Sequence, residues 1–397
     1  MNQKLKVALL AVITIITAFF ISQNKIEIKD EVKNSVVKTK IEKRAIFISY
    51  IEYQDYLKGK NKQDITNEIT KMIDNIKKYK FNMLILHVSP FSDAIYESKI
   101  FPSSSSIVNK EGEKLPIDVL SYFIEVAHKN NIELHAWINP YRISNSTDVT
   151  KLSSTNPAYK WLNTNNVKVI ENKGIYYNPA SSEVHDLIIS GIEEIVKNYD
   201  VDGIHLDDYF YPDTTIDLEN YQPFENTISL TDYRLSNINK LVKDIYDKIK
   251  SINNKVLFGI SPEGNIENNY NNNYADVKKW ISEKGYIDYI MPQLYYGFLN
   301  ESKPFLKTLN EWYDLVKIDI AFIPALALYK SGTIDEYAKS GKYEWIENND
   351  IIVREIKSLK SLKKYDGYSL FRYSNLINYS DRTNLESELT KIMNLDN

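Results

Sequence analysis

Two adjacent aspartates, Asp207 and Asp208, stand in the segment of this sequence best suited to acid–base chemistry. The segment is GIHLDDYFYP, residues 203–212. Two carboxyl groups can divide the work of hydrolysis, because one attacks or activates water while the other donates a proton to the leaving oxygen. Glu263, in the segment GISPEG at residues 259–264, is the natural second acid by position. The candidate catalytic residues are therefore Asp207, Glu263 and Asp208.

The elements that position these acids alternate along residues 44–397. Eight apolar runs are predicted strands: 45–52, 81–90, 132–140, 201–210, 256–264, 286–296, 318–329 and 367–373. Between strands, apolar residues recur with helical spacing, within 65–76, 119–127, 187–196, 238–245 and 351–356. This alternation predicts an α/β fold, and it favours a closed (β/α)₈ barrel of the TIM type over an open doubly wound sheet. The absence of a GxGxxG or Walker-type loop also weighs against nucleotide-binding folds.

Strand parity predicts which side chains enter the barrel, since alternate residues of a strand face opposite sides. With the apolar Ile204 and Leu206 facing the helices, Asp207 points inward, and Asp208 points outward unless a bulge re-aims it. The same rule places inside the barrel His87, Ser89, His135, Trp137, Asn139, His205, Tyr209, Ser261, Glu263, Met291, Gln293 and Tyr295. Asp207 and Glu263 then occupy equivalent positions at the ends of adjacent strands, where barrel enzymes build their sites.

Other polar and aromatic residues at the strand ends are candidates for substrate binding. They are Glu52, His135, Trp137, Asn139, Arg142, His205, Tyr209, Gln293 and Tyr295. For Glu52, Arg142 and Gln293 the alternative is an ordinary role in fixing a loop or a strand end. The long polar stretches 141–182 and 211–228 are predicted to wall a cleft for an extended ligand. Aromatic surroundings would raise the pKa of one carboxyl by desolvation, which suits a general acid.

Five ordered motifs make the sequence resemble the glycosyl-hydrolase-like 10 family, formerly classed as a domain of unknown function. They are YIE at 50–52, HAWINPYR at 135–142, GIHLDDYFYP at 203–212, GISPEG at 259–264 and MPQLYY at 291–296. The resemblance covers roughly residues 43–380 and implies a carbohydrate-active barrel. A weaker similarity is to α-amylase-like barrels, whose fourth strand carries GxRxD with an aspartate nucleophile. That similarity implies a nucleophile at Asp207 and an acid at Glu263, although His205 replaces the arginine.

The composition narrows the partners that need to be considered. The net charge is −4 with signs interspersed, which does not point to nucleic acid. The chain has no cysteine, so it has no disulfide, no thiolate metal site and no cysteine nucleophile. We expect no cofactor and no metal.

The amino-terminal segment predicts export. Lys4 and Lys6 precede an apolar run over residues 7–21, and the next charge is Lys25. Residues 1–24 are a predicted signal peptide or uncleaved signal anchor, residues 25–43 a polar linker, and residues 44–397 the barrel. The positive residues stay in the cytoplasm, so the rest of the chain is predicted to be extracytoplasmic, either anchored in the membrane or secreted.

These patterns together predict a glycoside hydrolase that acts on an extracytoplasmic polysaccharide. Its location favours cell-wall peptidoglycan as the substrate. One alternative is a non-catalytic glycan-binding barrel whose stacking platforms are Trp137, Tyr141, Tyr177, Tyr209 and Tyr295. Another is a metal-dependent barrel hydrolase, in which His87, His135 and His205 join Asp207 to hold a water-activating metal.

Overall fold

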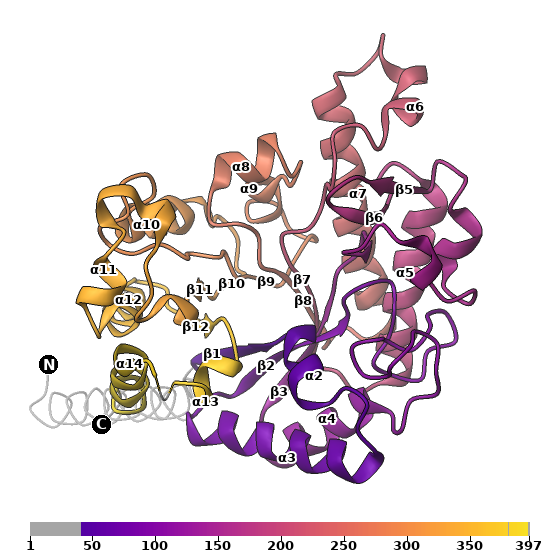
Figure 1. The fold of residues 1–397 in the computed structure, drawn as a ribbon. Helices are drawn as coiled ribbons and strands as arrows, with labels where there is room; N and C mark the ends of the chain where they lie inside the picture. Colours follow the sequence, from indigo (N-terminus) through magenta and orange to yellow (C-terminus); the bar gives the residue numbers. More distant parts are fainter. Residues whose placement is uncertain (1–40, 380, 396–397) are drawn as a thin grey trace, which may run out of the picture. The chain divides into compact units, whose positions relative to one another are not determined.

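All eight predicted strand regions contain strands of one large sheet in the computed structural model, which describes residues 41–379 and 381–395. The strands are β1 (Lys43–Ile48), β2 (Met83–Ser89), β3 (Glu133–Ile138), β7 (Gly203–Leu206), β8 (Leu257–Ile260), β9 (Tyr289–Ile290), β10 (Ala321–Phe322), β11 (Ala325–Leu326) and β12 (Gly367–Leu370). Their order is β10-β9-β8-β7-β3-β2-β1-β12-β11, and all neighbours are parallel. The result is an α/β fold built on a curled parallel sheet (Figure 1).

The strands β10 and β11 come from one predicted strand that is interrupted at Ile323 and Pro324. The first part pairs with β9 and the second with β12. Beyond β9, the N–H of Leu294 donates to the carbonyl of Ala325 at 2.9 Å. The N–H of Ala325 in turn donates to the carbonyl of Pro292 at 2.9 Å. The segment after β9 is therefore hydrogen-bonded to β11 as well as lying next to β10.

The longer helices lie around the strands (Figure 1). Helices run over α2 (Tyr50–Tyr56), α3 (Lys62–Lys78), α4 (Val119–Lys129), α5 (Ser182–Asn198), α6 (Leu218–Tyr221), α7 (Leu230–Ile252), α8 (Ile266–Asn271), α9 (Val277–Trp280), α10 (Phe305–Leu315), α11 (Glu344–Glu347), α12 (Ile351–Lys360), α13 (Ser374–Ile377) and α14 (Thr383–Met393). The five predicted helical patterns are confirmed as α3, α4, α5, α7 and α12. In α3, for example, Asn61 caps the first turn and a buried stripe from Ile65 to Ile76 faces the core.

The alternation of side chains along the strands is confirmed by two separate apolar clusters. Ile204 and Leu206 belong to the large cluster that includes the buried helix faces. A second cluster includes Phe47 and Met291, and it lies on the other face of the sheet. The prediction for Ser89 is wrong, because the register of β2 shifts between His87 and Ser89. A bulge of this kind turns the following side chain to the other side.

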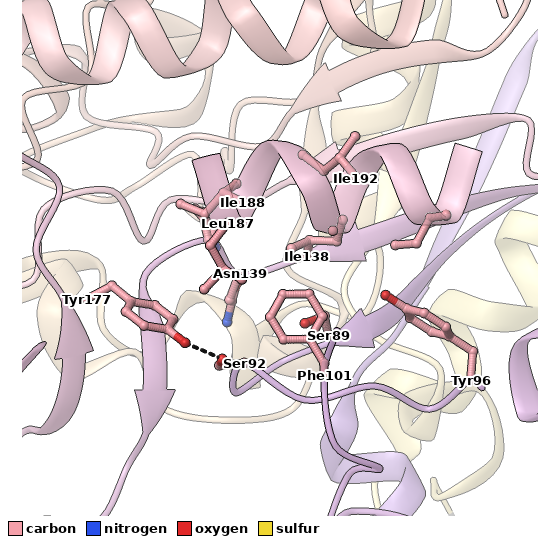
Figure 2. A pocket seen from close by; sticks show the side chains of 13 residues that line it. Ser89, Ser92, Tyr96, Phe101, Ile138, Asn139, Tyr177, Leu187, Ile188 and Ile192 are labelled. Carbon is pink, nitrogen blue, oxygen red and sulfur yellow. Dashed lines mark hydrogen bonds between the residues drawn. The ribbon is translucent and has the colours of Figure 1, made fainter. Parts of the chain in front are cut away.

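The stretch 141–182 forms a small antiparallel sheet instead of an irregular loop. Its strands are β4 (Arg142–Ser144), β5 (Val167–Ile170) and β6 (Gly174–Tyr177), in the order β4-β6-β5. Figure 2 shows how this sheet is tied to the segment after β2, since the hydroxyls of Ser92 and Tyr177 are 2.6 Å apart. This attachment fixes the wall that β4 and β6 present to the carboxyl end of the large sheet.

The predicted signal or anchor at 1–24 lies outside the described residues, as do residues 25–40 of the predicted linker. Lys43, the last residue of that predicted linker, already belongs to β1. Within the described residues, no helix has the length and apolar character needed to cross a membrane.

Three buried glutamates gather near the carboxyl-terminal helices. Glu344 accepts hydrogen bonds from the N–H groups of Phe298 and Leu299, and Glu388 accepts them from the first turn of α12. Glu355 is fully buried, and neither of its carboxyl oxygens has a partner among the described residues. Burial, followed by the charges of Glu388 and Glu344, raises the pKa of Glu355 well above its ordinary value. Glu355 is therefore a neutral, unsatisfied polar group in the folded protein.

Replacing Glu355 with methionine is expected to stabilise the fold more as the pH rises. An acid whose pKa is raised by folding contributes its full share to the free energy of unfolding below its unfolded pKa of about 4.3. That contribution is lost as the pH rises towards the pKa of the folded state. We expect Glu355→Met to add about 1–3 kcal/mol to the free energy of unfolding near pH 8, and clearly less near pH 4.5. Denaturant titrations across this range measure the effect, with Lys357→Gln on the exposed face of α12 as the control. A gain that does not vary with pH would contradict the assignment.

Candidate active site

The interior of the sheet holds a hydrogen-bonded polar network beneath the site. The hydroxyl of Tyr289 lies 2.8 Å from Nδ1 of His135 and 3.0 Å from Nδ1 of His205, whose Nε2 lies 2.9 Å from the hydroxyl of Ser261. A Cβ at Gly203 would lie 2.2 Å from the His135 ring, so only glycine leaves room for this histidine. Both histidines are fully buried, and burial lowers the pKa of His205 to about 3 and that of His135 well below its ordinary value.

Neither His135 nor His205, both predicted to bind substrate, lines the cavity described below. Both rings point into the barrel as predicted, but they lie below the cavity and hydrogen-bond to protein groups. Among the described residues, no group of three or more His, Asp or Glu side chains is arranged to hold a metal ion. The ligand set predicted for a metal-dependent hydrolase, with His87, His135 and His205 around Asp207, is not found there.

A cavity of about 390 Å³ opens above this network at the carboxyl ends of the strands. Its lining includes Asp207, Asp208, Trp137, His87 and Gln293. The rings of His87 and Trp137 are stacked at 3.6 Å with an angle of 9° between them. Burial lowers the pKa of His87 well below its ordinary value, so this ring is neutral. The cavity therefore has an aromatic floor beside two carboxyl groups, which suits a sugar ring with an apolar face and polar edges.

Asp207 is 5% exposed and is surrounded by hydrogen-bond donors. With its amide nitrogen towards the carboxyl, Asn139 donates to Oδ2 at 2.6 Å and to Oδ1 at 2.8 Å. The N–H of Tyr209 donates to Oδ1 at 3.2 Å, and the Trp137 side chain also hydrogen-bonds to Asp207. Burial, and then the charge of Asp208, raises the pKa of Asp207 to about 8, while the charge of Arg142 opposes this change.

Asp208 also lines the cavity, which corrects the prediction that it points outward. The prediction assumed a strand to residue 210, but β7 ends at Leu206, so strand alternation does not apply to either aspartate. Asp208 hydrogen-bonds to the side chain of Gln293. Burial raises the pKa of Asp208 to about 6, and the charge of Glu263 adds to this effect. The two carboxyls therefore hold one proton between them at neutral pH.

Glu263 lies in a neighbouring cavity of about 320 Å³ and does not line the one that contains Asp207. Its Oε2 accepts a hydrogen bond from the Asn268 side chain, which comes from the first turn of α8. Asp208 borders both cavities, together with Arg142 and Tyr209. Asp207 thus shares its cavity with Asp208 and not with Glu263, which was the predicted partner and lies three residues beyond the end of β8.

Arg142 stands between the two cavities in a fixed position. Its guanidinium lies 4.6 Å from the ring centroid of Tyr209, 4.8 Å from that of Phe91 and 5.6 Å from that of Tyr50. Its Nη2 donates to the side-chain oxygen of Asn139 at 2.5 Å. Arg142 thereby holds Asn139 in the orientation that presents its N–H groups to Asp207. Tyr209 is 49% exposed at the mouth of the site, so it does not point into the barrel as parity predicted.

Arg372 was not predicted from the sequence, yet it forms part of the cavity wall. Its Nη1 donates to Oε1 of Glu52 at 2.9 Å and lies 3.3 Å from the hydroxyl of Ser49. Its Nε and Nη2 have no partner among the described residues. The predicted substrate contact at Glu52 is wrong, because this residue lies in the first turn of α2 instead of ending a strand and is fully buried. No sequence signal pairs Glu52 with a residue 320 positions away.

Some of the tyrosines near the site line the large cavity, and others are buried in the fold. No described residue hydrogen-bonds to the hydroxyls of Tyr50, Tyr295 or Tyr329, which all line the large cavity. Tyr177, predicted as a stacking platform, is instead buried against Ser92. It lines a separate cavity of about 20 Å³ between the ends of β2 and β3 and helix α5 (Figure 2), which also includes Ser89, Asn139 and apolar side chains. That space holds about one water molecule and cannot admit a sugar.

The sequence model of the family described as glycosyl hydrolase-like 10 matches residues 42–332. Glycosyl hydrolase YngK of Bacillus subtilis (strain 168) is 36% identical over 304 residues, which cover 70% of this chain and 58% of that protein. Glycosyl hydrolase DigH of Escherichia coli (strain K12) is 30% identical over 334 residues, which cover 76% of this chain and 74% of that protein. The match thus spans little more than half the length of the B. subtilis relative.

Two solved structures with a similar fold are those of glycoside hydrolases. The glycoside hydrolase domain of PgaB (BpsB) from Bordetella bronchiseptica aligns with a TM-score of 0.60 at 12% identity, covering 89% of this chain and 99% of that domain. α-L-Fucosidase isoenzyme 2 from Paenibacillus thiaminolyticus aligns with a TM-score of 0.51 at 12% identity, covering 89% of this chain and 49% of that one. At these identities the likeness concerns the fold alone.

Removing the Glu52 carboxylate is expected to destabilise the protein. Glu52→Ala would leave Arg372 without its buried partner, and such losses cost about 3–5 kcal/mol. Urea denaturation measures this change, with Asp55→Ala on the exposed side of the same helix as the matched control. A Glu52→Ala protein with normal stability and a raised KM would instead restore the predicted substrate contact.

Proposed function

The chain belongs to the glycosyl hydrolase-like 10 family, and we propose that it is a glycoside hydrolase in which Asp207 and Asp208 cleave a glycosidic bond of an extracytoplasmic polysaccharide. The carrying observation is the pair of consecutive carboxyls at one cavity wall, with Asp207 buried and Asp208 partly exposed. Their raised pKa values, about 8 and about 6, leave one proton between them near pH 7. Glycoside hydrolysis by two carboxyls needs one of them ionised and the other protonated. Open tyrosine hydroxyls and an aromatic floor in the same cavity support a sugar as the ligand.

The hydrogen-bond partners assign the proton within this pair. Asp207 faces the amide N–H groups of Asn139, the N–H of Tyr209 and the positive charge of Arg142. Taken one at a time, the pKa values of about 8 for Asp207 and about 6 for Asp208 would leave the proton on Asp207. There it would meet donors only and would find no acceptor among these groups, so we assign the ionised form to Asp207. Asp208 carries the proton and borders both cavities. It is placed to donate to an oxygen that lies between two sugars.

In the proposed mechanism, the sugar that keeps the anomeric carbon occupies the large cavity beside Asp207. Asp208 donates its proton to the glycosidic oxygen as the bond to that carbon breaks. The Asp207 carboxylate then either attacks the carbon or activates a water molecule. The configuration of the first sugar released distinguishes these routes, since retention requires two displacements and inversion requires one. Arg142 and Asn139 act by holding Asp207 ionised and in place.

We also propose that the curled sheet is a closed (β/α)₈ barrel. Counting β10 and β11 as two halves of one strand gives eight strands, and the hydrogen bonds that join Ala325 to Leu294 and to Pro292 support closure. The predicted export segment at residues 1–24 supports a location outside the cytoplasm, with the chain anchored or secreted. A hydrolase in that place meets envelope glycan first, so we propose peptidoglycan as its substrate.

Exchanging either aspartate for asparagine is expected to abolish most turnover of glycan strands from purified sacculi. General acid–base and nucleophilic groups typically contribute about 10²–10⁴-fold each, so we expect Asp207→Asn and Asp208→Asn to lower kcat at least a hundredfold. Mass analysis of released fragments measures turnover. Asp200→Asn, a 92% exposed residue before the start of β7, is the control. If the wild-type protein binds these strands but releases no fragments, the chain is a glycan-binding barrel and not a hydrolase.

The pH dependence of kcat/KM is expected to be bell-shaped with its maximum near pH 7. Below about pH 6 both carboxyls are protonated and the carboxylate is lost, whereas above about pH 8 both are ionised and the acid is lost. Initial rates from pH 4 to pH 10 test this prediction. The residual activity of Asp208→Asn on substrates with good leaving groups should lack the alkaline limb. Persistence of that limb in Asp208→Asn would assign the proton to another residue.

A further inference from the structure

A second cavity adjoins the proposed catalytic pair, and the mechanism above leaves it unused. It has a volume of about 320 Å³ and is walled by residues from β4, β6 and the segments after β7 and β8. It shares Arg142, Asp208 and Tyr209 with the first cavity, while Asp207 borders the first cavity alone. The two cavities, at about 390 and 320 Å³, are each as large as the pockets that proteins use for small ligands.

We propose that the second cavity binds the sugar on the leaving-group side of the scissile bond, so that a glycan crosses Asp208 and is cut within the chain. This inference rests on the proposed function. The anomeric carbon must face Asp207, which assigns the first cavity to the sugar that keeps this carbon. The leaving oxygen lies between the two sugars and needs the proton of Asp208, which borders both cavities. The sugar attached through that oxygen then lies in the second cavity.

The second cavity presents the groups that a sugar requires. Glu263 has its Oε2 hydrogen-bonded to the Asn268 side chain, while its Oε1 has no partner among the described residues. A carboxylate oxygen held in this way can accept a hydrogen bond from a sugar hydroxyl. Tyr176 on β6 is partly exposed in the same cavity and offers an aromatic face. Glu263 is thus a specificity-determining residue that contacts the leaving sugar.

The walls of this cavity are fixed before substrate binds. Lys173 donates from Nζ to the carbonyl of Pro212 at 3.2 Å and to Asp213 at the same distance. These bonds join the β5–β6 turn to the segment that follows β7, across the side of the cavity. Asn269 holds the backbone of Glu263 through a bond of 2.6 Å to its carbonyl. A preorganised site of this kind loses little entropy on binding a second sugar.

The test compares substrates with and without a sugar on the leaving side. Glycan strands from purified sacculi place a sugar in the second cavity, whereas a 4-methylumbelliferyl glycoside of the same repeating unit does not. We expect Glu263→Gln and Tyr176→Ala each to lower the ratio of kcat/KM for strands to that for the aryl glycoside by about tenfold, which corresponds to about 1.4 kcal/mol. Tyr159→Ala, exposed in the same wall stretch but outside both cavities, should leave the ratio unchanged.

Product lengths and binding separate this inference from the proposed function. Early products of intermediate length support a glycan that spans both cavities, while release of terminal units alone would overturn it. Equal losses on both substrates would also overturn it and make Glu263 catalytic. If the wild-type protein cleaves neither substrate, binding of strand fragments to Asp207→Asn is measured by calorimetry. The same measurement is then made on the double variant that combines Asp207→Asn with Glu263→Gln. If long fragments bind this variant more weakly and short fragments bind it unchanged, the second site is supported although the hydrolase proposal is contradicted.

Discussion

Two carboxyl groups on consecutive residues repel each other when both are ionised, and burying them strengthens that repulsion. The end of β7 imposes this situation on Asp207 and Asp208, and much of the surrounding structure compensates for it. Asn139 supplies two N–H groups to Asp207, and Arg142 holds Asn139 in the required orientation. Arg142 is in turn held among three aromatic rings. This chain of contacts surrounds Asp207 with donors and positive charge, while Asp208 stands at the boundary between the two cavities.

The interior of the curled sheet supports the pair from below without adding charge. Burial keeps His87, His135 and His205 neutral, so they do not compete with Arg142 in setting the charge of the aspartates. On the opposite side, the ion pair between Glu52 and Arg372 joins the segments that follow β1 and β12. Because Glu52 is buried with its charge compensated, Arg372 is oriented towards the cavity. The first and last strands of the sheet thereby contribute one wall of the site.

The sequence allowed the strands, the main helices and the inward face of each strand to be predicted, since hydrophobic periodicity reports directly on burial. It failed where the regular strand stops. Asp208 and Tyr209 lie beyond the end of β7, and Ser89 follows a bulge, so alternation gave the wrong side for each. Arg372 and its contact with Glu52 could not be predicted from the sequence, for a different reason. An ion pair between residues 320 positions apart leaves no local pattern, and only the pairing of β1 with β12 brings the two together.

The boundary of the family match separates two parts of this site. Asp207, Asp208, Glu263 and Gln293 all fall within residues 42–332, whereas Arg372 and Asn375 lie beyond them. The family match therefore includes the two aspartates and residues of both cavities that meet at Asp208. It does not include the part of the cavity wall that Arg372 provides. Nε and Nη2 of Arg372 have no partner among the described residues, so this wall offers open N–H donors at the large cavity. These open donors thus depend on the segment after β12, whereas the carboxyl pair depends on where β7 ends.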